Sequence, residues 1–221
     1  MEAGITMHDC EAVLFDMDGT LVDSTAVVER HWARWAARRG VDLAAVLAIS
    51  HGRPTLDTLS LIAPQWATAE EAAGLDTAEG EDSEGLAAVP GARELAAALP
   101  PARWAVVTSA GRTLARSRLA AAGLPLPAVL VTADDVSPGK PSPDGYLEAG
   151  RRLSVRPERC LVFEDAPVGV QAGVAAGATV VGLTTTFAVL DGCAHRVADL
   201  AAVRLIDSGP PLRLSIRALA R

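Results

Sequence analysis

The stretch that decides the fold is Glu11-Ala12-Val13-Leu14-Phe15-Asp16-Met17-Asp18-Gly19-Thr20, a short apolar run that leads directly into two carboxylates and a glycine. This order is typical of a buried strand of a parallel sheet that opens into a functional loop. Within a strand, Asp16 and Asp18 would point to opposite faces of the sheet. Beyond the strand end the chain can curl at Gly19, because glycine tolerates backbone conformations that other residues avoid. Both carboxylates can then face one cavity.

Four later runs of apolar residues have the same character, being short and rich in valine, leucine and alanine. They span residues 104–107, 128–131, 161–163 and 178–183. Helical patterns lie between them, for example from Gly111 to Ala122 and from Pro143 to Leu153. Alternating strands and helices predict an α/β fold, with a parallel sheet covered by helices. In such sheets, sites form beyond the carboxyl ends of the strands.

The interval from 23 to about 86 breaks this alternation, because its signals are all helical. Helix starts are predicted near Ser24, Pro54 and Thr68, and Gly40 can end the first of these helices. We interpret the interval as an all-helical insertion. The chain then divides into a core of residues 1–22 and 88–221 and a helical cap of residues 23–87.

Two segments have weaker patterns. The stretch from Asp76 to Gly85 is rich in acidic residues and glycine, so we expect a flexible connector within or leaving the cap. In the tail from Ser208, the pair Pro210-Pro211 breaks any helix. We expect residues 212–216 either to add an edge strand or to lie loosely.

Composition excludes several classes of function. The formal net charge of -7 argues against a general nucleic-acid binder, which needs a basic face. No uninterrupted apolar run approaches the ~20 residues of a membrane span, and the first ten residues do not look like an export signal. The three cysteines are widely spaced and odd in number, which favours a reducing compartment. We therefore expect a cytoplasmic protein without a membrane or nucleic-acid partner.

The paired carboxylates point to metal-assisted chemistry. Close carboxylates repel unless a cation lies between them or one stays protonated. Mg²⁺ prefers about six oxygen ligands and keeps some positions for water and substrate phosphate. We expect Asp165, at the end of another predicted strand, to be the third contributor beside Asp16 and Asp18. With the metal and the Lys140 ammonium drawing charge from a phosphoryl group, Asp16 can attack phosphorus and form an aspartyl phosphate. Asp18 can protonate the leaving alkoxide and later activate water.

Two further groups can hold the phosphoryl oxygens. They are the hydroxyl of Thr108 and the backbone N–H of Ser109, at a strand end where a helix begins. Each feature alone has an ordinary explanation, namely a turn for the two acids, a solvated loop charge for Lys140 and a helix cap for Thr108. Four such clusters at successive strand ends of one α/β chain are poorly explained by chance. The set therefore predicts a site of phosphoryl transfer.

Together these segments resemble those of the haloacid dehalogenase superfamily, in the family's order and over essentially the whole chain. The matching segments are Asp16-Met17-Asp18-Gly19-Thr20, Val107-Thr108-Ser109, Lys140-Pro141 and Glu164-Asp165-Ala166-Pro167-x-Gly169. The resemblance implies a Rossmann-like core with a small helical cap inserted after the first strand. It also implies that Mg²⁺ is held by Asp16, Asp165 and the backbone carbonyl of Asp18. Glu164 would act in the outer shell of the metal.

The resemblance also narrows the reaction. Members that cleave carbon–halogen bonds lack the second carboxylate, so Asp18 disfavours dehalogenation. Segments 50–55 and 84–91 look like those of the sugar-phosphatase branch, which includes 2-deoxyglucose-6-phosphate, hexitol-phosphate and glycerol-3-phosphate phosphatases. This implies magnesium-dependent hydrolysis of a small sugar or polyol phosphate. His51 and Arg53 are the candidates for a cap loop that faces the substrate, although an ordinary interhelix turn explains them nearly as well.

Two alternatives remain open at this point. A phosphohexomutase of the β-phosphoglucomutase type shares every core motif but returns the phosphoryl group to a second sugar hydroxyl. A non-catalytic relative that binds phosphate or metal would keep the fold, but the intact set of catalytic side chains argues against it. Cap-bearing members of the superfamily commonly act as monomers, and we expect the same of this chain.

Overall fold

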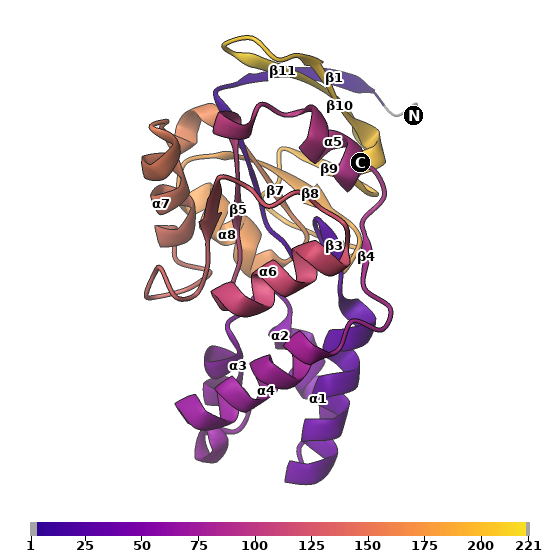
Figure 1. The fold of residues 1–221 in the computed structure, drawn as a ribbon, viewed down its shortest axis with the longest axis vertical. Helices are drawn as coiled ribbons and strands as arrows, with labels where there is room; N and C mark the ends of the chain where they lie inside the picture. The colour runs from indigo at the N-terminus through magenta and orange to yellow at the C-terminus, as the bar shows by residue number, and fades with distance from the viewer. Residues whose placement is uncertain (1–3, 220–221) are drawn as a thin grey trace.

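The computed structural model of the chain describes residues 4–219. Its centre is a parallel sheet of six strands in the order β6-β5-β2-β7-β8-β9 (Figure 1). The strands are β2 (Ala12–Phe15), β5 (Trp104–Val107), β6 (Val129–Val131), β7 (Cys160–Glu164), β8 (Thr179–Leu183) and β9 (His195–Val197). The sheet confirms the predicted α/β fold, and β9 is an additional edge strand that the sequence patterns did not predict.

Helices cover both faces of this sheet. One face packs against α5 (Ala92–Ala98) and α6 (Arg112–Ala121), and the other packs against α7 (Asp144–Leu153) and α8 (Pro167–Ala175). The central strand β2 is completely buried, because helices lie over both of its faces. Its last residue, Phe15, is in register with Val106 of β5 and Phe163 of β7. The ends of these three strands therefore lie side by side.

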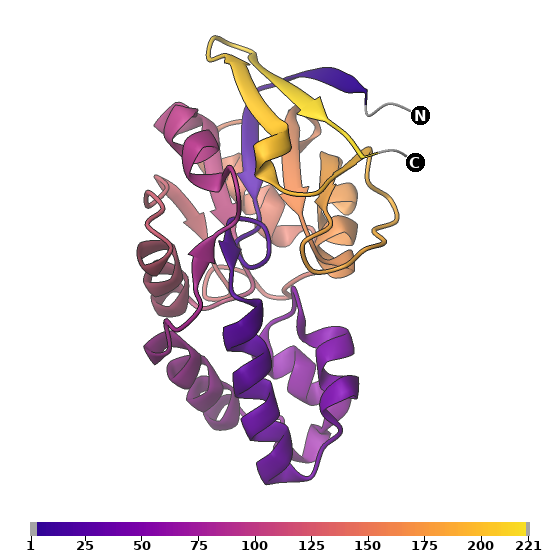
Figure 2. The ribbon, with the colours of Figure 1, turned by 90° about the vertical axis from the view of Figure 1, so that its right-hand side faces the viewer.

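A second, antiparallel sheet of three strands lies at the opposite end of the core from the helical cap (Figures 1 and 2). It consists of β1 (Ile5–Cys10), β11 (Leu212–Arg217) and β10 (Val203–Asp207), with β11 in the middle. Residues 212–217 form a strand, as one of the two expectations held, but the strand lies in the middle of this sheet and not at an edge. Leu212, Leu214 and Ile216 alternate along β11 and are buried, so one face of the strand belongs to the core.

Four helices lie between the paired short strands β3 (Val22–Asp23) and β4 (Ala87–Ala88). They are α1 (Thr25–Arg39), α2 (Leu43–Ser50), α3 (Thr55–Ile62) and α4 (Ala69–Glu81). Trp32, Trp35, Val46 and Leu59 form part of a hydrophobic cluster of their own. This separate cluster supports the predicted cap, whose boundaries at residues 22/23 and 87/88 stay a prediction. The helices project from the sheet beyond its carboxyl edge (Figure 2).

The predicted flexible connector from Asp76 to Gly85 was wrong over its first part. Residues 76–81 are the last turns of α4, and only the residues after Asp82 leave the helix for β4. The helix is held at its start by Thr68, whose hydroxyl accepts a hydrogen bond from the Glu71 N–H. Leu75 and Glu79 are buried on its inner side. An acidic, glycine-containing segment is therefore helical because one of its sides is packed.

Short 3-10 turns complete the fold at Pro64–Trp66, Pro101–Arg103, Pro157–Arg159 and Leu200–Ala202. Within residues 4–219, no helix combines the length and the apolar character needed to cross a membrane.

Candidate active site

The predicted core site residues meet at the carboxyl edge of the parallel sheet. Asp16 follows β2, Thr108 follows β5, and Glu164 and Asp165 end β7 or follow it. Lys140 reaches the same place from the loop before α7. All five side chains are buried, with at most 5% of their surface exposed. The structure therefore brings together residues that are up to 149 positions apart in the sequence.

Lys140 is the electrostatic centre of this cluster. Its ammonium group donates to the Asp16 carboxylate, to Glu164 Oε1 at 2.6 Å and to the Val107 carbonyl at 3.2 Å. Burial disfavours the charged ammonium, but the two carboxylates outweigh this effect and raise the pKa of Lys140. Lys140 therefore carries a positive charge beside Asp16 throughout the physiological range of pH.

Glu164 is held from all sides. Its carboxylate accepts hydrogen bonds from Lys140, from the Tyr146 hydroxyl at 2.9 Å, and from the backbone N–H groups of Asp165 and Ala166. Gly169 on α8 lies so close that a Cβ there would be 1.7 Å from Glu164 Oε1. The carboxylate therefore fits only because residue 169 has no side chain. Its oxygens are engaged within the protein, which supports the prediction that Glu164 acts behind the metal ligands.

The arrangement around Asp16 fits a divalent metal ion. One carboxylate oxygen each from Asp16, Glu164 and Asp165 lies within 4.8 Å of the others. Among residues 4–219, Asp16 Oδ2 is buried without any hydrogen-bond partner. Burial and the neighbouring carboxylates raise the pKa of Asp16 well above its usual value and that of Asp165 to about 8, because three close carboxylates face the single positive charge of Lys140. A hard cation would satisfy both the orphaned oxygen and the charge.

The loop after Asp16 packs closely against Asp165. Gly19 has a positive φ of 81°, and a Cβ at this position would lie 2.0 Å from Asp165 Oδ2. Thr20 donates its hydroxyl to Asp165 Oδ1 at 3.4 Å. The Gly19 carbonyl accepts from the Thr185 hydroxyl at 2.5 Å. The predicted curl at Gly19 therefore brings the loop against Asp165, as a shared metal site requires.

The Asp18 side chain lines the pocket beside Asp16 and has partners that the sequence did not reveal. Asp18 Oδ1 accepts from Ser24 Oγ at 2.8 Å and from Arg118 Nη1 at 2.8 Å. Arg118, on α6, also donates through Nη2 to Glu79 of the cap helix α4 at 2.5 Å. One buried guanidinium thus links the Asp18 loop to the cap. An arginine within an amphipathic helix carries no motif that would have identified it from the sequence.

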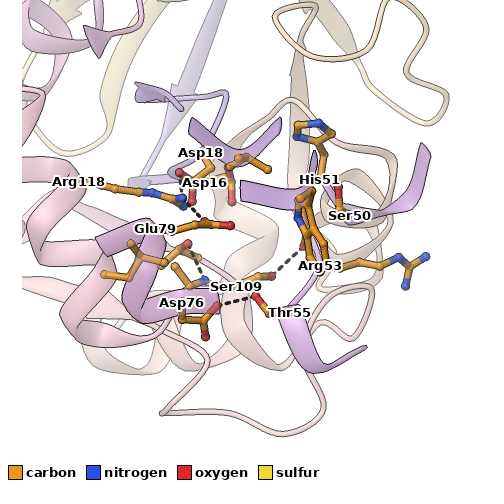
Figure 3. A pocket seen from close by; sticks show the side chains of 16 residues that line it. Asp16, Asp18, Ser50, His51, Arg53, Thr55, Asp76, Glu79, Ser109 and Arg118 are labelled. Carbon is orange, nitrogen blue, oxygen red and sulfur yellow. Dashed lines mark hydrogen bonds and ion pairs between the residues drawn. The ribbon is translucent and has the colours of Figure 1, made fainter. Parts of the chain in front are cut away.

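The cap loop between α2 and α3 lies directly over the strand ends (Figure 3). Ser109 donates its hydroxyl to the Gly52 carbonyl at 2.8 Å. A Cβ at Gly52 would lie 2.7 Å from the Ala166 side chain, so the loop and the core are in close contact. His51 and Arg53 both line the pocket, but the guanidinium of Arg53 is directed away from Asp16, Asp18 and Glu79 (Figure 3). Substrate binding by His51 and Arg53 stays a prediction.

A pocket lies between the cap and the core. The core contributes Asp16, Asp18, Thr108, Ser109 and Arg118, and the cap contributes residues from α1, α3, α4 and the loop at 50–53. Its free volume is about 60 Å³, far below the ~300 Å³ at the lower end of common ligand pockets. A second cavity of about 370 Å³ lies beside it, shares Thr55, Asp76, Thr108 and Ser109 with it, and extends to Lys140.

Comparisons with known proteins agree with this site. The model of the haloacid dehalogenase-like hydrolase family matches residues 10–177. Hexitol phosphatase A of Escherichia coli (strain K12) is 44% identical over 79% of this chain and 83% of its own length. Glycerol-1-phosphate phosphohydrolase 2 of Saccharomyces cerevisiae is 36% identical over 80% of this chain and 75% of its own length.

A solved structure of a hydrolase from Pseudomonas syringae superposes with a TM-score of 0.76 at 27% identity, over 87% of this chain and 94% of that one. The family match includes the strand ends after β2, β5 and β7 and the Lys140 loop, which carry the buried cluster. The chain therefore belongs to the family of haloacid dehalogenase-like hydrolases.

Proposed function

We propose that this protein is a magnesium-dependent phosphatase that hydrolyses small sugar or polyol phosphates through an aspartyl phosphate at Asp16. The observation that carries the proposal is the state of the Asp16 carboxylate. One of its oxygens pairs with Lys140, while the other is buried without a partner in the described part of the chain, and the carboxylate lies in a cluster with Glu164 and Asp165. A bound cation would balance the negative charge of a carboxylate held in this way. The carboxylate could then attack the phosphorus of a substrate.

The roles of the other residues follow from their places. Asp16, Asp165 and the backbone carbonyl of Asp18 would hold Mg²⁺, with Glu164 behind them. When bound, the ion would withdraw charge from the phosphoryl oxygens and favour attack by a carboxylate. Lys140 would supply a second positive charge on the phosphoryl group. Its contacts with Val107 and Glu164 fix the ammonium before any substrate arrives, so little reorganisation is needed in the transition state.

Thr108 and Ser109 would hold the remaining phosphoryl oxygens. The Thr108 side chain accepts a hydrogen bond from the Ala110 N–H at 3.1 Å, which leaves its hydroxyl proton available to a phosphoryl oxygen. The Ser109 hydroxyl is used by Gly52, so the proposed phosphate contact of Ser109 is its backbone N–H. This contact would tie phosphate binding to the position of the cap loop.

Asp18 would protonate the leaving alkoxide and then activate the water that attacks the aspartyl phosphate. For this purpose the Asp18 side chain must turn from Ser24 and Arg118 toward the leaving oxygen. Its exposure of 24%, against 5% for Asp16, is consistent with a group that can turn. The cap would also move, because the space directly between Asp16, Asp18 and the cap, about 60 Å³, is too small for a whole sugar phosphate. Opening admits substrate and water, and closure excludes bulk water during phosphoryl transfer.

The substrate class follows from the relatives rather than from the cluster itself. The hexitol phosphatase and the glycerol-1-phosphate phosphohydrolase act on small phosphorylated polyols, as their names state. A phosphohexomutase shares the same cluster, and no residue contact favours it over a hydrolase. All the proposed groups come from one chain, so a monomer would be competent.

Product analysis tests the proposal. The purified protein is incubated with Mg²⁺ and a panel of sugar and polyol phosphates, and both inorganic phosphate and isomeric sugar phosphates are measured. We expect free phosphate, no isomer, and loss of release in D16N. The matched control is D191N, because Asp191 is exposed and does not line the pocket. Near-normal release by a folded D16N protein would refute the assignment, and an isomeric product would identify a mutase.

A further inference from the structure

One wall of the pocket is acidic. Asp76 and Glu79, one turn apart on α4, both line it beside Asp16 and Asp18, and Figure 3 shows their carboxylates below the Asp18 loop. Glu79 is 7% exposed, and Asp76 is half-buried. Asp76 Oδ1 accepts from the Thr55 hydroxyl at 2.6 Å. This wall belongs to the cap, on the side of the pocket where the non-phosphate end of a substrate would lie.

The two arginines that line the pocket do not neutralise the negative charge of this wall for a bound ligand. Arg118 is bound to Asp18 and Glu79 together, so two carboxylates already use its single charge. Arg53 is the other arginine that lines the pocket; its Nε is buried without a partner among residues 4–219, but its guanidinium is directed away from the acidic wall (Figure 3). A second anionic group at this wall would therefore meet carboxylates, with Arg118 already paired and Arg53 turned to the other side of the pocket.

The wall carries its full negative charge only above about pH 7, where Glu79 is ionised. Burial, together with the negative charges of Asp18 and Asp76, raises the pKa of Glu79 to about 7 despite the attraction of Arg118. Burial likewise raises the pKa of Asp76. An uncharged hydroxyl is attracted to these two side chains, because it can donate to a carboxylate oxygen and form a charge-assisted hydrogen bond. Glu79 Oε1 and Asp76 Oδ2 accept no hydrogen bond from the residues 4–219 that the structure describes, and they remain available.

A further polar group in the pocket points to a ligand. Ser50 is 7% exposed, and its hydroxyl is buried without a partner among residues 4–219. A buried hydroxyl without a partner is unfavourable, and a hydroxyl group of a substrate would provide the missing bond. Val28, Trp32 and Leu114 add apolar surface to the same pocket, which suits the carbon chain between hydroxyl groups.

We infer that Asp76 and Glu79 form a specificity wall that accepts phosphate esters whose far end carries uncharged hydroxyl groups, and that rejects esters with a second phosphate or a carboxylate. The inference rests on the proposed phosphatase activity and narrows its substrate class. The two carboxylates accept hydrogen bonds from the substrate hydroxyls, and Ser50 adds a third polar contact. The same carboxylates repel a second anion.

A matched pair of substrates tests the wall. Glycerol 3-phosphate and 3-phosphoglycerate have the same carbon skeleton and differ at the far end, where one has a hydroxyl group and the other a carboxylate. We expect kcat/KM of the wild-type protein for glycerol 3-phosphate to exceed that for 3-phosphoglycerate by on the order of a hundredfold, from like charges a few ångströms apart near a protein surface. The variants E79Q and D76N should each reduce this ratio about tenfold or more.

The matched control is E81Q, because Glu81 is on the same helix but exposed; its ratio should equal that of the wild type. If E79Q does not melt cooperatively, D76N decides, because Asp76 has no bond to Arg118. The inference would be overturned if the ratio stayed unchanged in the folded wall variants. It would also be overturned if an active wild type hydrolysed both esters equally; in both cases the proposed function would stand. A wild type inactive on both esters and on an aryl phosphate would overturn the proposed function, and the wall with it.

Discussion

The contact between Gly169 and Glu164 allows a sharp test of how the buried cluster is built. In G169A the new Cβ would lie 1.7 Å from Glu164 Oε1 and 2.0 Å from Cδ, so the carboxylate must move. Movement breaks its bonds to Lys140, Tyr146 and two backbone N–H groups. Disrupting a buried ion pair destabilises by about 3–5 kcal/mol, and the helix propensity of alanine returns at most about 1 kcal/mol.

G169A is therefore expected to lower the free energy of unfolding by about 2–4 kcal/mol. This change lowers Tm by about 5–15 °C in a chain of this size. Phosphate release should fall as well, because Lys140 loses one of the contacts that fix it beside Asp16. The control is G74A, since a Cβ at Gly74 in α4 has nothing within 4 Å; its Tm should stay constant or rise slightly. Calorimetry on both variants checks the prediction. A G169A protein with wild-type Tm and activity would refute the reasoning.

Two further predictions concern pH and the tail. Because burial raises the pKa of Glu79 from 4.5 to about 7, the folded state binds more protons than the unfolded state between these values, and stability from this group falls as pH rises from about 4.5 to 7. Thermal melts across that range should show wild type losing stability relative to E79Q, and parallel curves would contradict this. Truncation after Ser208 removes the buried side chains of Leu212, Leu214 and Ile216, whose burial stabilises the fold by about 5–9 kcal/mol. The truncated protein should show no cooperative melt. A wild-type Tm would disprove the role of β11.

The core of the fold was predictable because its signals are local. Short apolar runs that end in polar residues mark β2, β5, β6, β7 and β8, and all five pair in the observed sheet. Strand β1 was missed because polar residues such as Thr6 and His8 interrupt its apolar ones. The role of β11 depends on pairing with β1, about 200 residues away, and no local pattern contains that information.

The candidate site divides in the same way. Asp16, Thr108, Glu164 and Asp165 were found because each lies at a strand end, and parallel strands bring their ends together; Lys140 comes from the loop before α7. The bridge from Asp18 through Arg118 to Glu79 was missed because it depends on how the cap helix lies over α6. The acidic segment at 76–81 was misread as flexible for the same reason. Side chains that join the cap to the core can be recognised only once the positions of both are known.

The central claim, that Asp16 is the nucleophile, is tested most directly by trapping its phosphorylated form. D18N should form the intermediate from an aryl phosphate, whose leaving group needs little protonation, and should hydrolyse it slowly because the group that activates water is absent. After acid quench with Mg²⁺ present, mass spectrometry should find one phosphoryl group on the peptide that contains Asp16, and none in the D16N/D18N double variant. A phosphoryl group on another residue, or release of phosphate by the double variant at the rate of D18N, would contradict the account.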